Sequence, residues 1–336
     1  MKPLIILTGP TAVGKTELSL RLAKSVGGEI ISADSMQVYR SMNIGTAKIM
    51  PEQMQGIKHY LIDCLSPEED FNVVLFQKMA KEAMEEIYKG GHIPIITGGT
   101  GFYIQSVLYD IDFSGNETED NSNENDMTDN MSLSPRLSKG EDLREYLSGI
   151  AQNHGADVLF QKLKQTDPES AESIHPNNVK RVIRALEYFY QTGQKISEHN
   201  RTQSQKSSPY NYVYFVLNDD RKLLYSRIDE RVEEMFKDGL EREVKSLIDS
   251  GLTRDSVSMQ GIGYKEMFGY FDGEYDLERA KYLIKLDTRH FAKRQITWFK
   301  REKDVSWLNL DEYGHSKDKL LEAMLEILRE KNIVQQ

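Results

Sequence analysis

One short segment near the N-terminus limits the possible folds of this chain more than any other: Gly9-Pro10-Thr11-Ala12-Val13-Gly14-Lys15-Thr16. It matches the pattern G-x-x-x-x-G-K-[ST] and joins an apolar run at 4–8 to an amphipathic segment at 15–26. Its glycines let the backbone curl, so that N–H groups point inward at phosphate oxygens beside a helix N-terminus. Lys15 supplies a cation and Thr16 a hydroxyl for Mg²⁺. The segment predicts a phosphate-binding loop between a strand and a helix.

The rest of the chain predicts an α/β fold of the P-loop NTPase type. Strand-like and helix-like segments alternate, which is typical of a parallel sheet flanked by helices. We expect strands at 4–8, 29–32, 93–97, 212–217 and 305–308, and helices at 15–26, 72–89, 177–190, 221–237, 278–300 and 317–329. The predicted domains are a core of 1–112 and 205–336, a disordered acidic insert at 113–140, and a helical insertion domain at 141–204.

The charge is distributed unevenly. The net charge is −10, yet residues 279–303 carry nine bases and two acids, whereas residues 114–135 carry six acids and no base. Because screening limits the reach of a charge to about 10 Å, a basic face can bind a polyanion on an acidic protein. No apolar run is long enough to cross a membrane, and the lone Cys64 cannot form an internal disulfide. We therefore expect a cytoplasmic protein.

A phosphate-binding loop does not identify a reaction. A small-molecule kinase and a nucleic-acid-binding NTPase are both alternatives, and each usually has an acidic residue at a strand end to help hold Mg²⁺. Here the strand at 93–97 ends in Gly98-Gly99-Thr100, so Asp34, after the strand at 29–32, is the candidate acid. Among the seven histidines and the single cysteine we find no spacing typical of a zinc site.

Further motifs resemble the tRNA dimethylallyltransferases, also called tRNA isopentenyltransferases. They follow the family order through nearly the whole chain: Gly9–Thr16, the segment at 32–40 (SADSMQVYR), 43–48 (NIGTAK), 98–103 (GGTGFY), 175–187 (HPNN and KRVIRALE), 260–265 (QGIGYK) and 293–300 (KRQITWFK). The acidic segment at 114–135 departs from the family pattern, because it is longer and more polar.

The resemblance implies transfer of a dimethylallyl group from its diphosphate to the exocyclic amine of the adenosine 3′ of the anticodon in tRNA. It also implies Mg²⁺ as cofactor and a monomer. The enzymes that prenylate free AMP or ADP are a close alternative, but basic segments at 180–184 and 293–300 favour tRNA.

The resemblance also assigns roles to residues. Asp34 matches the general base that takes the proton of the attacking amine, although a helix cap or a Mg²⁺ ligand would also explain an aspartate there. Thr11, Lys15 and Arg221 match residues that contact the diphosphate. Considered without the family, Arg221 is an ordinary surface charge in a first helical turn.

The expected tRNA contacts combine charged, amide and aromatic side chains, which suit phosphates and an extruded base. Gln37 can pair with an adenine edge, and a solvated polar residue is the alternative. The full set is Asp34, Ser35, Met36, Gln37, Thr100, Arg144, Lys180, Arg181, Arg184, Gln260, Gly263, Tyr264, Lys265, Lys293, Arg294, Gln295, Trp298 and Lys300.

Overall fold

A computed structural model describes residues 1–113 and 143–334 of the 336-residue chain. The described residues divide into two compact units: unit 1 is Met1–Leu108 with Ser208–Gln336, and unit 2 is Tyr109–Ser207. Most of the acidic insert predicted at 113–140 lies outside the described residues. No helix among those residues is long and apolar enough to cross a membrane.

Unit 1 is built on a parallel sheet, which confirms the predicted α/β fold. Within the described residues the sheet has six strands in the order β3-β2-β4-β1-β5-β6. They are β1 (Pro3–Thr8), β2 (Gly28–Ala33), β3 (His59–Tyr60), β4 (Ile93–Gly98), β5 (Asn211–Asn218) and β6 (Val305–Asn309). The short edge strand β3 was not predicted, because two residues leave no periodicity to recognise. β1 lies between β4 and β5, so β2, β3 and β4 lie on one side of it and β5 and β6 lie on the other. The carboxyl ends of strands at such a switch point are a usual place for a ligand.

Helices cover both faces of this sheet. α1 (Lys15–Val26) and α13 (Lys317–Glu330) pack on one face, and their residues Leu18, Leu22, Leu320 and Met324 share a core with the strands. On the other side are α2 (Val73–Lys89) and α3 (Gly101–Leu108). The predicted helix at 72–89 begins one residue later, because the side chain of Asn72 caps it by accepting the N–H groups of Val74 and Leu75.

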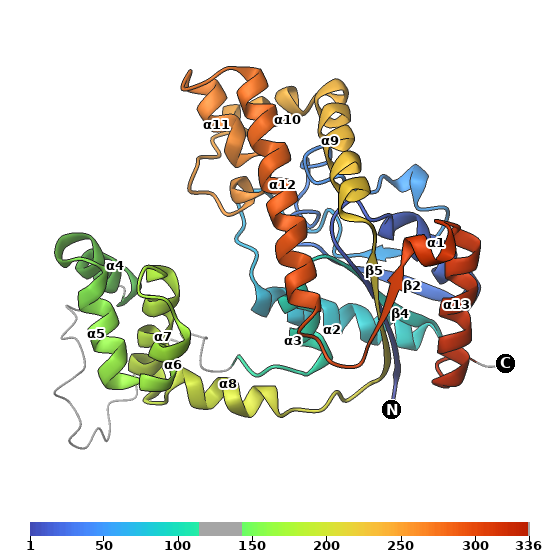
Figure 1. Ribbon diagram of the computed structural model, residues 1–336, viewed down its shortest axis with the longest axis horizontal. Coiled ribbons are helices and arrows are strands. Elements are labelled where there is room, and N and C mark those ends of the chain that lie inside the picture. The colour runs from blue at the N-terminus through green and yellow to red at the C-terminus, as the bar shows by residue number, and fades with distance from the viewer. Residues whose placement is uncertain (114–142, 335–336) are drawn as a thin grey trace. The chain divides into compact units, whose positions relative to one another are not determined.

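A group of helices rises from one end of the sheet (Figure 1). It comprises α9 (Arg221–Asp238), α10 (Leu240–Asp249), α11 (Lys265–Phe271) and α12 (Leu277–Phe299). The long α12 packs against α9, α11 and α3, and it therefore connects this group with the sheet. Its N-terminus is capped by Asp276, which accepts the N–H of Arg279.

The regular structure in the described residues of unit 2 is helical. It contains α4 (Leu143–His154), α5 (Ala156–Thr166), α6 (Pro168–Ser173), α7 (Val179–Thr192) and α8 (Ile196–Ser204). The apolar stripe predicted on the helix at 177–190 is buried in its core, where Val182, Ile183 and Leu186 meet residues of α4 and α5. Asp167 links α6 to α8, because its carboxylate accepts hydrogen bonds from both Ser170 and Ser197.

Candidate active site

The phosphate-binding loop connects β1 to α1 in the way that its motif requires. Gly9 has φ of 148° and Gly14 has φ of 96°, both in the region that favours glycine. A Cβ atom at Gly9 would also lie 2.5 Å from the carbonyl oxygen of Leu217, so the loop packs directly on β5. The ammonium of Lys15 folds back over the loop and donates to the carbonyl oxygens of Gly9 and Pro10, at 2.9 and 2.8 Å.

The charges around Lys15 make this loop a strong attractor of anions. Burial, and then the nearby charge of Arg231, lower the pKa of Lys15 to about 7, while Asp34 opposes this shift. Burial also lowers the pKa of Arg231, on α9. Arg231 is exposed on α9. An anion in the loop would relieve this crowding of positive charge.

Asp34 follows β2 and is half-buried. Its Oδ1 accepts the backbone N–H groups of Met36 and Gln37, at 2.8 and 3.3 Å. Burial raises the pKa of Asp34, and those two N–H groups and then Lys15 oppose the rise. A carboxylate that is more basic than usual, beside a phosphate-binding loop, has the property that a proton acceptor needs.

Gln295 on α12 holds the phosphate-binding loop in place. Its Oε1 accepts the N–H of Thr11 at 2.9 Å, and its Nε2 donates to the carbonyl oxygen of Gly99 at 3.0 Å. A Cβ atom at Gly99 would be 2.0 Å from that Nε2, so position 99 has no room for a side chain. We predicted Gln295 to contact tRNA, and that contact stays a prediction. The residue is 5% exposed, and its side-chain amide is hydrogen-bonded within the protein.

The diphosphate contact predicted for Arg221 stays a prediction. Arg221 is exposed in the first turn of α9 and stacks on the ring of Tyr225, 5.1 Å from its centroid. The arginine whose charge acts on Lys15 is Arg231, nearly three turns further along the same helix. In the sequence, nothing separates Arg231 from the other arginines of α9, because only the packing of the helix decides which of them faces the loop.

The side-chain amide of Gln37 is hydrogen-bonded within the protein, in part to the loop at 43–47. Gln37 donates to the carbonyl oxygen of Thr46 at 3.2 Å and accepts from the hydroxyl of Ser32 at 3.2 Å. Glu243 holds the same loop by accepting the N–H groups of Asn43, Ile44 and Gly45, at 2.8, 2.8 and 3.0 Å. Reading of an adenine by Gln37 would have to replace its bonds within the protein.

The motif at 260–265 divides between buried and exposed residues. Tyr264 is fully buried and donates to Glu243 at 2.7 Å. Gly263 is buried too and donates its N–H to Glu266 at 2.8 Å. Both were predicted to contact tRNA, and the structure gives them a place in the scaffold instead. Gln260 and Lys265 are exposed, and Lys265 lies 3.1 Å from Asp287.

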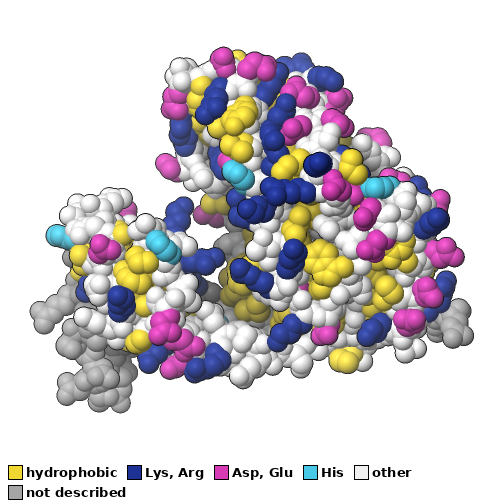
Figure 2. Space-filling view, in the orientation of Figure 1, with side chains coloured by type: hydrophobic (Ala, Val, Ile, Leu, Met, Phe, Trp, Pro, Cys, Tyr) yellow, Lys and Arg dark blue, Asp and Glu magenta, His cyan; other side chains and the backbone are white. Residues whose placement is uncertain are grey.

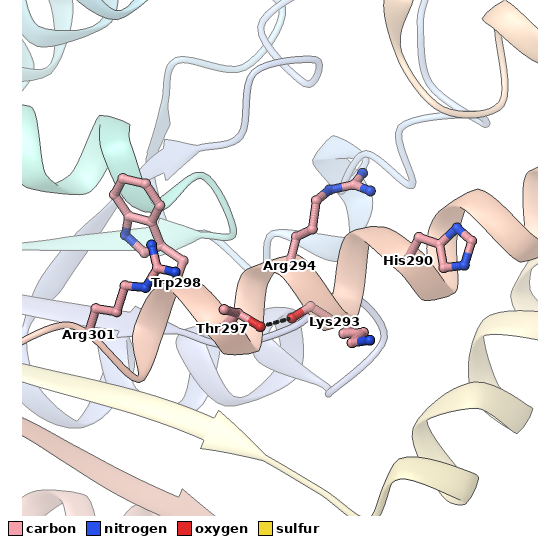
Figure 3. Close-up of a pocket in the computed structure, with 6 residues that line it drawn as sticks. All are labelled: His290, Lys293, Arg294, Thr297, Trp298 and Arg301. Carbon is pink, nitrogen blue, oxygen red and sulfur yellow. Dashed lines mark hydrogen bonds between the residues drawn. The ribbon is translucent and has the colours of Figure 1, made fainter. Parts of the chain in front are cut away.

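A basic surface follows α12. Figure 2 shows Lys and Arg side chains gathered on the visible face where this helix runs. A pocket of about 420 Å³ is lined by His290, Lys293, Arg294, Thr297, Trp298 and Arg301, and Figure 3 shows Arg294 and Trp298 pointing to the same side of the helix. The exposed ring of Phe102 meets Trp298 edge to face, 6.2 Å between centroids. The pocket thus combines cations with aromatic surface, and Lys300 is exposed beside it.

The remaining predicted tRNA contacts lie around the Asp34 loop and in unit 2. Ser35, Met36 and Thr100 are half-buried in unit 1. In unit 2, Lys180 and Arg181 are exposed at the start of α7. Arg144 and Arg184 instead lie 2.7 and 3.4 Å from the same carboxylate, that of the buried Glu187. This pairing reduces the charge that they present to a polyanion.

No group of three or more His, Cys, Asp or Glu side chains among the described residues could hold a metal ion. A magnesium ion does not need such a cluster, because it usually keeps several waters and binds through few protein ligands and substrate phosphates. Thr16 is exposed in the first turn of α1, where its hydroxyl can serve in this way.

Comparison with known proteins places the chain in a family. Residues 37–302 match the model of the IPP transferase family. A tRNA dimethylallyltransferase of Lachnoclostridium phytofermentans is 55% identical over 99% of this chain and 100% of its own length. A full-length tRNA isopentenylpyrophosphate transferase from Bacillus halodurans is 39% identical, with a TM-score of 0.67 over 99% of this chain and 98% of its own. A eukaryotic dimethylallyltransferase described as acting on tRNA is 30% identical, with a TM-score of 0.74 over 92% of this chain and 74% of its own. The chain therefore belongs to the IPP transferase family, with the tRNA dimethylallyltransferases.

Proposed function

We propose that this protein transfers the dimethylallyl group of dimethylallyl diphosphate to the N6 amine of the adenosine 3′ of the anticodon in tRNA. The observation that carries the proposal is the meeting of Asp34 with Lys15 and Arg231 at one edge of the sheet. A proton acceptor and an anion site are the two parts that this reaction needs. Membership of the family decides between this reaction and that of a kinase, which would use the same loop.

In the proposed reaction the N6–C1 bond forms as the bond between C1 and the bridging oxygen breaks. The amine loses its proton to Asp34, and the electron pair of the broken bond leaves with the diphosphate. Lys15, Arg231 and the loop N–H groups stabilise the charge that develops there. Thr11 is the loop residue whose hydroxyl is proposed to approach the bridging oxygen, and Gln295 fixes its backbone.

Mg²⁺ is the proposed cofactor, held by the hydroxyl of Thr16 and by diphosphate oxygens. When bound, it would neutralise part of the leaving-group charge. The protein alone supplies the positions of the loop and of Asp34. We propose that it works as a monomer.

Each unit is proposed to contribute its own tRNA contacts: the pocket along α12 in unit 1, and the exposed start of α7 in unit 2. Arg294 and Arg181 are both exposed and suit phosphates. Replacing each with alanine is expected to weaken tRNA binding and to reduce its dependence on salt concentration. If neither replacement alters that dependence, RNA binds elsewhere.

A transfer assay tests the function. Purified protein is incubated with unmodified tRNA, labelled dimethylallyl diphosphate and Mg²⁺, and the RNA is then digested. We expect labelled adenosine next to the anticodon. Label on AMP, with none on tRNA, would contradict the proposed acceptor, and consumption of ATP with neither product labelled would favour a kinase or NTPase.

A further inference from the structure

The first turn of α13 brings a lysine against the phosphate-binding loop. A Cβ atom at Gly14 would lie 2.6 Å from the Nζ of Lys317 and 3.8 Å from its Cε. The ammonium thus occupies the space that a side chain at position 14 would take. Gly14 immediately precedes Lys15 and Thr16, the residues proposed to bind the diphosphate and Mg²⁺.

Neighbouring cations form ion pairs, whereas Lys317 forms none with the residues that the structure describes, although the carboxylates of Glu17 and Asp219 act on it from further away. Arg21 lies 2.7 Å from both Glu17 and Asp318. Arg227 lies 2.6 Å from Asp219, whose other oxygen is 2.9 Å from His315. Within residues 1–113 and 143–334, no carboxylate oxygen lies within 4.0 Å of the Nζ of Lys317.

The position of Lys317 is fixed by the core. Its helix begins at Ser316, whose side chain accepts the N–H of Lys319. Three residues of α13, Leu320, Met324 and Leu328, are fully buried in the core that also contains α1. Because α1 starts at the phosphate-binding loop, the packing of α13 on α1 fixes the position of Lys317 relative to the loop.

We infer that Lys317 is a third cation of the diphosphate site, beside Lys15 and Arg231, contributed by the C-terminal helix. Its ammonium attracts the diphosphate held by the loop, both in the donor and in the released product. The inference rests on the proposed function, since it assumes that the loop holds a diphosphate. The sequence pattern of the loop ends at Thr16 and gives no indication of a contribution from a residue 301 positions later.

Binding of inorganic diphosphate, measured by calorimetry on the full chain with Mg²⁺, tests this inference. Lys317→Met keeps most of the aliphatic length and removes the charge, and we expect it to raise the dissociation constant about tenfold. The dependence of binding on ionic strength should also decrease. Lys317→Arg should stay close to the wild type. The exposed Lys319, in the same turn of α13, provides the matched control Lys319→Met, which should bind normally.

A second variant, Lys15→Met, shows whether a negative result concerns Lys317 alone or the whole proposed diphosphate site. If it abolishes diphosphate binding while Lys317→Met binds like the wild type, the inference about Lys317 is overturned and the donor site stands. If Lys15→Met also binds normally, the proposed donor site fails and Lys317 loses its role. A lower urea midpoint for Lys317→Met with an unchanged dissociation constant would mean a purely structural lysine. Lys317→Gln replaces the methionine variant if the latter does not fold.

Discussion

Replacement of Gln295 by alanine distinguishes a clamp on the phosphate-binding loop from an RNA contact. The change leaves two backbone groups without their partner, the N–H of Thr11 and the carbonyl of Gly99. Leaving a buried polar group unsatisfied costs ~1–3 kcal/mol. Because both groups are only partly buried, we expect the free energy of unfolding to fall by about 2–3 kcal/mol in total. Urea unfolding followed by tryptophan fluorescence measures this loss.

The same replacement should slow transfer. A misplacement of about 1 Å at a reacting centre can cost about 100-fold in rate, so we expect kcat/KM for dimethylallyl diphosphate to fall between about 10-fold and 100-fold. The dissociation constant for tRNA should stay unchanged. Gln295→Glu keeps an acceptor for Thr11 but adds negative charge near the diphosphate, so it should be more stable than Gln295→Ala and no faster.

Arg294→Ala, one residue away, is the matched control, because Arg294 is exposed on the pocket side of α12. It should weaken tRNA binding and leave the affinity for the diphosphate donor intact. The reasoning is refuted if Gln295→Ala has wild-type stability and donor kinetics but binds tRNA poorly. That result would return Gln295 to the RNA surface, as its sequence motif suggests.

Three further predictions follow from the site and its surroundings. Asp34→Asn should lose the chemical step in single-turnover assays and keep its affinity for tRNA, since only the proton acceptor is removed; an unchanged rate would exclude Asp34 as the base. Arg231→Gln should raise the dissociation constant for diphosphate about tenfold or more, whereas Arg221→Gln should have a smaller effect, and calorimetry that gives the opposite order would favour Arg221 as the diphosphate contact. Burial raises the pKa of Glu302 to about 7, above its unfolded value, so the charged form destabilises the folded protein increasingly as pH rises from about 4.5 to 7. Glu302→Gln should therefore be more stable than the wild type at pH 8 and equal to it at pH 4, and urea unfolding that gives the same difference at both pH values would contradict this.

Motif and periodicity were sufficient to predict the parallel sheet and the phosphate-binding loop, because both depend on local patterns. They did not identify Arg231, because a helix with several arginines carries no local mark of the one that faces a loop distant in sequence. The motif at 293–300 likewise contains residues with two different roles. Gln295 binds the phosphate-binding loop while Arg294 and Trp298 line the pocket, and only the packing of α12 in the fold shows which residue does which. Tyr264 and Gly263 likewise belong to a motif in which some residues pack in the interior and others lie at the surface.

The double use of α12 has a consequence for the affinities of the two substrates. Arg294 and Trp298 line the pocket, and Gln295, within one turn of both, holds the backbone of Thr11. If RNA binds the pocket as proposed and shifts the helix, the shift would reach the loop proposed to hold the donor. Thermodynamic reciprocity would then require the donor to change the affinity for RNA by the same factor as RNA changes the affinity for the donor. A single helix would thus couple the binding of the two substrates, although they touch different residues.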